Sequence, residues 1–462
     1  MTDTSKQEHP VDSAFRRFSP ISEKCVERTT RVFPGGDTRA SATYFPYPLA
    51  IKSGEGCRLT DVDGNVLNDF MNNFTSLIHG HAFSPTVGAV QTQVALGTAF
   101  AAPCSAQIEL AELIVDRIPS VEQIRFTSSG TESTQMAIRC ARAATGRQKV
   151  MKMEGGYHGS YEMAEVSMLP LPNECGPIEA PVSLPIDDSF PDSALTETIV
   201  CPYNEPDIAA NLIAENAEVL AAVIVEPMLG SMGMVPATTE FLSALRRETE
   251  SRGIVLIFDE VITFRLNTAG MQALHGISPD LTCLGKVIGG GLPIGAIGGR
   301  RDLLQLFSPE QRKVGHASTF SGNALSMAAG LAAMTHYNEN DIDRLDHLGN
   351  RLRQGFNDVF RSTGIKGQAT GVGSLVNIHL TDRTIMNARD TFQGMIDAGE
   401  IARLLHLSML QNGVMSAPRM MYCISSPMTE QEVDHAIAAL ESSLTNLMPY
   451  IAAEQPNLLA NG

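Results

Sequence analysis

The amino-acid sequence predicts an α/β protein, with a large domain built on a mainly parallel sheet and a smaller α+β domain built from both ends of the chain. From about residue 85, short apolar runs alternate with helical stretches, as where QIRFT is followed by ESTQMAIRCARAATG. This alternation is typical of α/β domains. The runs VLAAVIVE and GIVLIFDE contain no polar alternation, as expected of strands that are buried on both faces. A chain of 462 residues also exceeds what one hydrophobic core usually serves, so a second domain is expected.

The domain limits are expected where the sequence pattern changes. Residues 1–60 form an N-terminal segment that should join the small domain. The large domain is expected over residues 61–325, and the rest of the small domain over residues 326–462.

Several elements have local signals. The stretch VDSAFRRF predicts a short helix, and the pair Asp63-Gly64 between two β-prone runs predicts a hairpin turn. The segment from about 169 to 197 is rich in Pro, Asp and Ser and predicts a long surface loop. The amphipathic TEQEVDHAIAALESSLTNLM predicts a final helix that is capped at Thr429. Two runs before it predict strands, GVGSLVNIHL and GVMSAPRMMYCISS.

Composition limits the classes of function. The formal charge is 34 − 51 = −17, and an acidic surface argues against nucleic-acid binding. The N-terminus lacks a signal-peptide pattern and the longest apolar run is too short to span a bilayer, so we expect a cytoplasmic protein without membrane contact. The eight cysteines lack CxxC or zinc-ligand spacing, and His79 and His81 have no evident third ligand nearby. We therefore expect no metal site.

Two segments bring charged side chains to strand ends. GIVLIFDEV ends a buried strand in Asp259 and Glu260, and LTCLGKVIGGG places Lys286 after another short apolar run. The separation of 286 − 259 = 27 residues leaves room for one helical connection. Ligands of open α/β sheets bind at the carboxyl ends of the strands, so Asp259 and Lys286 are candidates for one site. Solvated charges at strand ends would explain each segment alone.

Two further segments could contact a small ligand. In QIRFTSSGTESTQMA, a strand leads into a helix that opens near Glu132, and the backbone amides at its start could hold a phosphate. An ordinary N-cap would explain the same residues. In GGYHG, Tyr157 could stack on a planar ring beside His158. A structural role is the commoner explanation for such a pair.

Together these segments are far more specific than any one of them. SSGTE, GGYHG, IFDEV and LGKVIGGGLPIGAIGG occur in the order and spacing of the class III aminotransferases, and the chain resembles that family from about residue 31 to 445. The resemblance implies the fold-type-I architecture that binds pyridoxal 5′-phosphate (PLP). It implies a homodimeric, PLP-dependent transaminase.

The resemblance also implies roles for individual residues. Lys286 would carry PLP as a Schiff base and later shuttle a proton, and Asp259 would pair with the pyridine nitrogen. Val261 and Tyr157 would cover the two faces of the ring. The phosphate would be held by three neighbouring residues, Ser129, Gly130 and Thr131.

Three more residues are assigned to the cofactor site by the same resemblance. Glu226 and His158 would lie beside the cofactor, and Thr319 of the partner subunit would reach the phosphate. An N-cap before a helix starting near Gly322 is an alternative role for Thr319.

Two arginines indicate the substrate. Arg39 in FPGGDTRAS and Arg419 in SAPRMM match arginines of the β-amino-acid aminotransferases, and an arginine binds a carboxylate through two parallel hydrogen bonds. Arg39 does not separate the two subgroups, because glutamate-1-semialdehyde aminomutase also has an arginine nearby, so Arg419 is the discriminating residue. We therefore expect transfer from a β-amino acid to a 2-oxo acid such as pyruvate or 2-oxoglutarate. Just beyond Arg39, three aromatic residues could either wall a side-chain pocket or pack in the core: Tyr44, Phe45 and Tyr47.

Other functions stay open at this point. The segment GKVIGGGLPIGAIGGRRDLL is also similar to glutamate-1-semialdehyde aminomutase, although that enzyme usually reads DEVMTGFR where this chain reads DEVITFR. An amine:pyruvate transaminase, or a PLP-dependent racemase or decarboxylase, would use the same cofactor residues. A binding protein without catalysis is disfavoured because Lys286 and Asp259 are both present.

Overall fold

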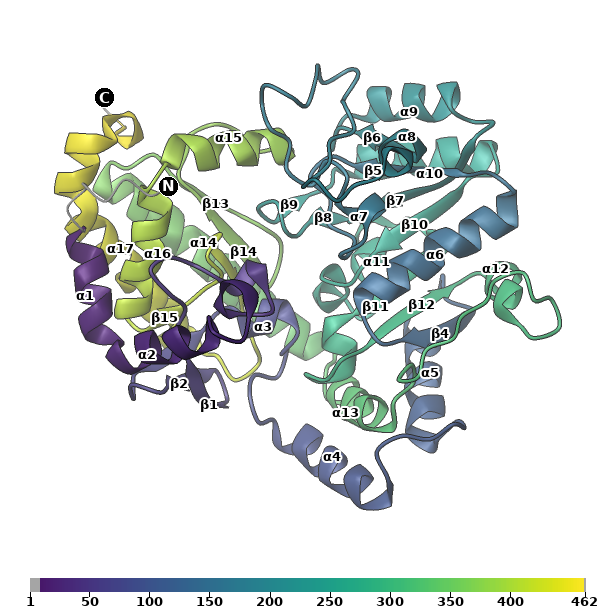
Figure 1. Ribbon diagram of the computed structural model, residues 1–462, viewed down its shortest axis with the longest axis horizontal. Coiled ribbons are helices and arrows are strands. Elements are labelled where there is room, and N and C mark those ends of the chain that lie inside the picture. Colours follow the sequence, from purple (N-terminus) through teal and green to yellow (C-terminus); the bar gives the residue numbers. More distant parts are fainter. Residues whose placement is uncertain (1–8, 461–462) are drawn as a thin grey trace.

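The structure is a computed structural model that describes residues 9–460, and a seven-stranded sheet lies at its centre (Figure 1). The strand order is β4-β12-β11-β10-β7-β5-β6. All neighbouring pairs are parallel except the two that include β12, which confirms the predicted mainly parallel sheet. The strands are β4 (Gln123–Thr127), β5 (Lys149–Met153), β6 (Thr198–Cys201), β7 (Leu220–Val225), β10 (Val255–Asp259), β11 (Leu281–Gly285) and β12 (Gly295–Gly299).

Helices cover both faces of this sheet (Figure 1). In β7, Ala222 and Ile224 pack in a cluster with α6 (Gly130–Thr145), whereas Val223 and Val225 pack in a cluster with α10 (Thr239–Ser251). Since successive side chains of a strand point to opposite faces, a strand between two helical layers must be apolar at every position. This explains the unbroken apolar run from which β7 was predicted.

A four-stranded sheet joins segments that are far apart in the chain. It has the order β1-β2-β3-β15, and the hairpin between β2 and β3 turns at Asp63-Gly64, as predicted. The predicted boundary between residues 60 and 61 falls inside this sheet. The strands are β1 (Ile51–Glu55), β2 (Arg58–Asp61), β3 (Val66–Asp69) and β15 (Val414–Met415).

A three-stranded antiparallel sheet and several helices complete this side of the molecule (Figure 1). The sheet contains β13 (Gln368–Thr370), β14 (Leu375–His379) and β16 (Met421–Cys423). Among the helices are α1 (Pro10–Phe18), α2 (Pro20–Thr29), α14 (Glu339–Thr363), α15 (Ala388–Ala398), α16 (Ile401–Gln411) and α17 (Glu430–Glu454). The capping box predicted at Thr429 begins α17.

The remaining elements are short or lie at the edges. The predicted loop over residues 169–197 is irregular until its last six residues, which form a helix. The remaining α-helices are α4 (Ser84–Leu96), α5 (Ser105–Arg117), α7 (Glu162–Glu165), α8 (Asp192–Glu197), α9 (Pro206–Glu215), α11 (Met271–His275), α12 (Arg301–Leu304) and α13 (Ala324–Thr335). Two strands form a small hairpin, β8 (Met228–Leu229) and β9 (Val235–Pro236). The 3₁₀ turns are η1 (Pro34–Gly36), η2 (Ala40–Ala42), η3 (Thr263–Leu266), η4 (Lys286–Gly289), η5 (Gln305–Phe307) and η6 (Pro456–Leu458). Within residues 9–460, no helix is long and apolar enough to cross a membrane.

Candidate active site

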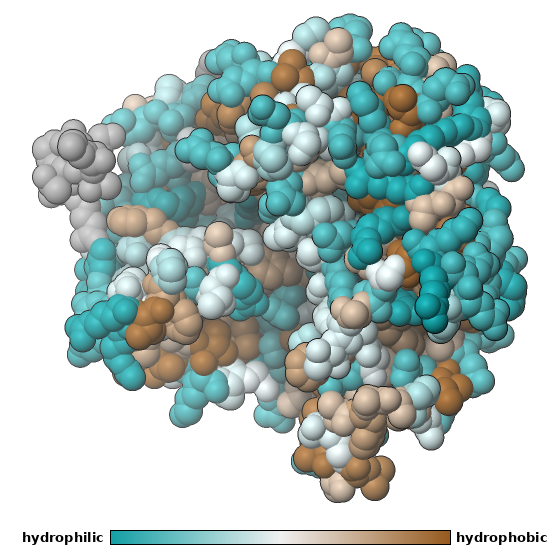
Figure 2. All heavy atoms as spheres, turned by 45° about the vertical axis from the view of Figure 1, so that its right-hand side comes forward, coloured by the Kyte–Doolittle hydropathy of each residue, from teal (hydrophilic) through white to brown (hydrophobic). Residues whose placement is uncertain are grey.

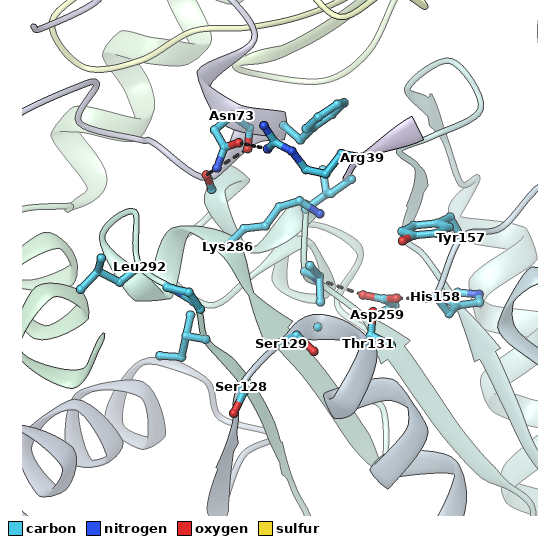
Figure 3. Close-up of a pocket in the computed structure, with 18 of the residues that line it drawn as sticks. Arg39, Asn73, Ser128, Ser129, Thr131, Tyr157, His158, Asp259, Lys286 and Leu292 are labelled. Atoms are coloured by element: carbon cyan, nitrogen blue, oxygen red, sulfur yellow. Dashed lines mark hydrogen bonds and ion pairs between the residues drawn. The ribbon is translucent and has the colours of Figure 1, made fainter. Parts of the chain in front are cut away.

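A cavity of about 390 Å³ lies where β10 and β11 end (Figure 3). The two strands run parallel, with Asp259 opposite Cys283, so Asp259 and the residue after β11 meet at one edge of the sheet. The predicted residues that line the cavity are Arg39, Ser129, Gly130, Thr131, Tyr157, His158, Glu226, Asp259, Val261 and Lys286.

The two carboxylates that end β10 have different surroundings. Asp259 lines the cavity, where His158 Nδ1 donates to Oδ2 at 2.9 Å and the Val261 amide donates to Oδ1 at 3.1 Å. Glu260 is fully buried and points away, accepting from the amides of Met271 and Gln272 at the start of α11. Successive side chains on a strand face opposite ways, so only Asp259 is available to a ligand in the cavity.

Lys286 follows β11 at the first position of η4. Its φ of +47° lies in the left-handed region, which residues other than glycine seldom adopt. Burial lowers the pKa of the Lys286 amine, while the charge of Asp259, and that of Glu226 when it is ionised, act in the opposite direction. A larger fraction of neutral amine is therefore present near neutral pH than for a lysine in water.

Two buried polar residues, His158 and Glu226, lie beside Tyr157. His158 has its pKa lowered mainly by burial, so its ring is neutral. Glu226 accepts from the amides of Tyr157 at 2.9 Å and Gly230 at 3.0 Å. Burial, and then the nearby charge of Asp259, raise the pKa of Glu226 well above its usual range. A protonated Glu226 leaves Asp259 as the stronger negative charge in the cavity.

The start of α6 forms the opposite wall. Ser129 is the N-cap, and its Oγ accepts from the Glu132 amide at 3.1 Å. The amides of the first helical turn have no acceptor within a helix, so those of Gly130 and Thr131 can bind an anion. A Cβ on Gly130 would lie 3.1 Å from the side chain of Val261, so these two residues pack closely. The helix begins at Gly130, two residues before the predicted start.

The roof of the cavity is an unusual turn. The four residues of α3 (Asn72–Thr75) all have positive φ, from +47° to +74°, so the turn is left-handed. Each non-glycine residue in this conformation costs about 1–2 kcal/mol, so surrounding contacts must hold it. Arg39 Nη1 donates to Asn73 Oδ1 at 2.9 Å, and both side chains lie above Lys286 in Figure 3.

Some predicted residues lie elsewhere. Thr319 is exposed and does not line the cavity, and Asn323 rather than Thr319 caps α13. Arg419 lies in the turn before β16, is exposed, and donates to the Ser231 carbonyl at 3.4 Å. It is not a lining residue either.

The three aromatic residues after Arg39 do not wall the cavity. Tyr44 and Tyr47 pack near Phe15 in a separate apolar cluster. Phe45 is exposed. Of the two readings that the sequence left open, the core explanation holds for Tyr44 and Tyr47.

The comparisons with known proteins agree with this geometry. The family model described as "Aminotransferase class-III" matches residues 40–441, which is most of the chain. The chain belongs to the class-III aminotransferases. These enzymes use PLP, so this chain is a PLP-dependent transaminase. Its fold is the fold-type-I architecture that the sequence predicted.

Several relatives of this class-III aminotransferase are enzymes with named activities. A β-phenylalanine transaminase from Variovorax paradoxus is 36% identical over 433 residues, covering 93% of this chain and 94% of the relative. A glutamate-1-semialdehyde 2,1-aminomutase from Methanosphaera stadtmanae is 34% identical over 429 residues, covering 92% and 98%. An ω-transaminase from Sphaerobacter thermophilus has a TM-score of 0.89 and is 41% identical, covering 92% of this chain and 98% of that one.

The cavity of this aminotransferase fits PLP. An amine on Lys286, a buried carboxylate on Asp259 and the anion-binding start of α6 correspond to three of the polar groups of PLP, namely its aldehyde, ring nitrogen and phosphate. Val261 packs against Gly130 on one side and against Gly285 on the other, where an added Cβ would lie 3.3 Å from it. A Cβ at either position would press on the Val261 side chain, so the two glycines give it the most room.

Sequence reasoning missed several lining residues. Asn73, Phe74 and Ser76 belong to the left-handed turn and its end, and Leu292 and Pro293 follow the glycines after Lys286. The glycine-rich run did indicate close approach near Leu292. The two asparagines of NNFTS tolerate a left-handed φ better than most residues, but four such residues in succession depend on distant contacts.

Proposed function

We propose that this transaminase moves an amino group from a β-amino acid to a 2-oxo acid. The observation that supports this most directly is the place of Arg39, whose guanidinium lies across the cavity from the start of α6, with Lys286 between them (Figure 3). A phosphate at α6 and a carboxylate at Arg39 would place the reacting amino group beside Lys286. The β-phenylalanine transaminase among the relatives points to the same substrate class.

The cofactor residues would act as follows. Lys286 would hold PLP covalently, and Ser129, Gly130 and Thr131 would bind its phosphate. Tyr157 and Val261 would cover the two ring faces. Bound PLP supplies an electron-withdrawing ring that stabilises negative charge on the substrate carbon next to nitrogen.

Asp259 would hold a proton on the ring nitrogen. The bonds from His158 Nδ1 and the Val261 amide fix the carboxylate and leave it directed into the cavity. A neutral Glu226 beside it would avoid a second buried negative charge, which would compete for that proton.

The Nζ of Lys286, once released by the substrate, would move the proton between substrate and cofactor carbons. Its lowered pKa favours the neutral amine that accepts a proton near neutral pH. Because Lys286 directly follows β11, the position of its backbone is fixed and its side chain lines the cavity.

Two carboxylate positions are proposed for the two substrates. Arg39 would bind the carboxylate nearer the cavity roof, and Arg419 would reach the cavity by a change of its side-chain rotamer. Arg419 has one long hydrogen bond to a carbonyl, and such a bond costs little to break.

A homodimer with shared sites is also part of the proposal. Thr319 and its neighbour Phe320 are exposed, and Phe320 is 61% exposed. Figure 2 shows apolar residues gathered on the projecting α4, where Val94 and Leu96 are exposed. An apolar projection of this kind suits a subunit interface, and Thr319 of the partner subunit would then reach the phosphate.

Spectra of the PLP-loaded enzyme would test the proposed substrate. We expect (S)- or (R)-β-phenylalanine to convert bound PLP to its aminated form, and a 2-oxo acid to reverse the change. Lys286→Ala should abolish the cycle.

Arg39→Ala and Arg419→Ala should each raise the KM of a carboxylate substrate by about tenfold to a hundredfold, since each loses a charge-assisted pair. A simple amine without a carboxylate is the control.

One result would replace the proposal. If only glutamate-1-semialdehyde reacts, and its isomer forms without any added 2-oxo acid, the function is the aminomutase activity of other relatives. A response to simple amines alone would instead indicate an amine:pyruvate transaminase.

A further inference from the structure

The hydrogen bond between Arg39 and Asn73 joins the proposed carboxylate site to the left-handed turn. Asn73 Oδ1 accepts from Arg39 Nη1 at 2.9 Å, while Asn73 Nδ2 donates to Ser76 Oγ at 3.1 Å. Ser76 Oγ in turn donates to the Asn73 carbonyl at 3.0 Å. A flipped amide would direct its NH₂ group at the guanidinium, where donor would face donor. The amide orientation is therefore set by its partners on both sides.

The turn that carries Asn73 is held from below. Arg265 is fully buried and its Nη1 donates to the Thr75 carbonyl at 3.2 Å. Asp69 Oδ1 accepts from the amides of Met71 and Asn72, each at 2.9 Å. Asn72 Nδ2 donates to the Cys423 carbonyl at 2.9 Å. These contacts come from the ends of β3 and β16 and from the turn η3, and they fix the backbone of Asn73, whose own side chain is exposed.

We infer that Asn73 is a positioning residue that determines specificity for a carboxylate substrate, because it holds the Arg39 guanidinium over the cavity through a neutral acceptor. This inference rests on the proposed carboxylate-binding role of Arg39. A guanidinium has five N–H donors, and the amide oxygen takes one of them. An aspartate at this position would instead neutralise Arg39 and compete with the substrate for the same donors.

The test measures binding of 3-phenylpropionate, an unreactive carboxylate, to the PLP-loaded full-length enzyme by calorimetry and by the absorbance of bound PLP. Asn73→Asp should weaken binding by at least about tenfold, since a like charge opposes the ligand. Asn73→Gly removes the amide but keeps the left-handed backbone without strain, and it should weaken binding by about threefold to tenfold. In both variants the KM of the β-amino acid should rise while kcat stays near the wild-type value.

Two comparisons make the test specific. Asn340→Asp makes the same charge change at an exposed residue of α14 that does not line the cavity, and this variant should bind the ligand as the wild type does. In an Arg39→Ala background, Asn73→Gly should cause no further weakening, because the Asn73 amide acts through Arg39. Unchanged binding in both Asn73 variants, with weakened binding in Arg39→Ala, would refute the inference and leave the proposed function intact. Unchanged binding in Arg39→Ala itself would overturn both.

Discussion

At the scale of single residues, Lys152 is a buried cation behind the loop that presents Tyr157 and His158. It is 1% exposed, and its Nζ donates to the carbonyls of Gly156, at 2.8 Å, and Val166. Both acceptors are neutral, so burial dominates and lowers the pKa of Lys152 to about 7.

This pKa predicts a pH dependence of stability. The unfolded chain keeps Lys152 protonated up to its ordinary pKa of 10.5, whereas the folded protein loses the proton above about 7. The unfolded state therefore binds more protons between these values, and the free energy of unfolding rises with pH, by up to about 1.4 kcal/mol per unit. Below the folded pKa this contribution is absent.

Lys152→Met should remove that rise. Urea unfolding at about pH 7 and about pH 9, at one protein concentration, should show that the free energy of unfolding of the wild type, minus that of the variant, is larger at the higher pH. Lys149→Met, on the same strand but only partly buried, is the matched control. A gap that is constant with pH would show that Lys152 stays charged in the folded protein.

The sequence predicted residues whose position follows from a regular element, and it did not predict those held by tertiary contacts. Asp259 and Lys286 end neighbouring parallel strands, so strand order alone brings them together. Asn73 depends on Asp69, Arg265 and the carbonyl of Cys423, which no local pattern reveals. The sequence also did not show which way Arg419 points, because a turn residue has no fixed face.

At the scale of elements, the end of β10 serves two structures at once. Asp259 points into the cavity, and Glu260 joins β10 to the start of α11. Thr263 Oγ1 also donates to Glu260 Oε2 at 2.7 Å. A carboxylate at a helix N-terminus is favoured by the free amides and by the helix dipole, so Glu260 fixes the path of the chain that leaves β10.

Glu260→Gln should lower the free energy of unfolding without changing the affinity for PLP. The amide NH₂ would face the hydroxyl of Thr263 or an amide of α11, and one unpaired buried donor costs about 1–3 kcal/mol. Chemical denaturation would measure this loss, and PLP titration should show an affinity within about threefold of wild type because Glu260 does not line the cavity. Glu250→Gln, at an exposed residue of α10, is the control. Loss of PLP binding at full stability would contradict this assignment.

The same reasoning explains which elements were predictable. Unbroken apolar runs revealed β7 and β10, which are buried on both faces, and the helical period of apolar residues revealed α17, which is buried on one face. The short α8 was missed because its six residues lie in a segment dominated by loop-forming residues.

At the scale of the whole molecule, the proposed homodimer with shared active sites predicts complementation between two inactive variants. Lys286→Ala and Thr319→Glu should each be inactive as homodimers. If Thr319 reaches the partner's phosphate site, a mixed dimer has one site with both defects and one site with neither. Co-refolding the two variants should therefore restore activity, up to about half per mixed dimer, in line with one intact site of two.

No recovery would mean that Thr319 serves its own subunit, since each site of the mixed dimer would then carry one defect. Different affinity tags on the two variants, and purification through both tags in turn, establish that mixed dimers formed. Lys286→Ala mixed with itself through the same refolding step gives the baseline.

The pairing of β3 with β15 has a consequence for how the protein is made. The central sheet needs only residues 123–299, so all its strands are available once that stretch has left the ribosome. The sheet that contains β1, β2 and β3 must wait for Val414, more than three hundred residues later. The growing chain therefore carries an incomplete β-edge through most of its synthesis, and such an edge is a site where nascent chains aggregate or recruit chaperones.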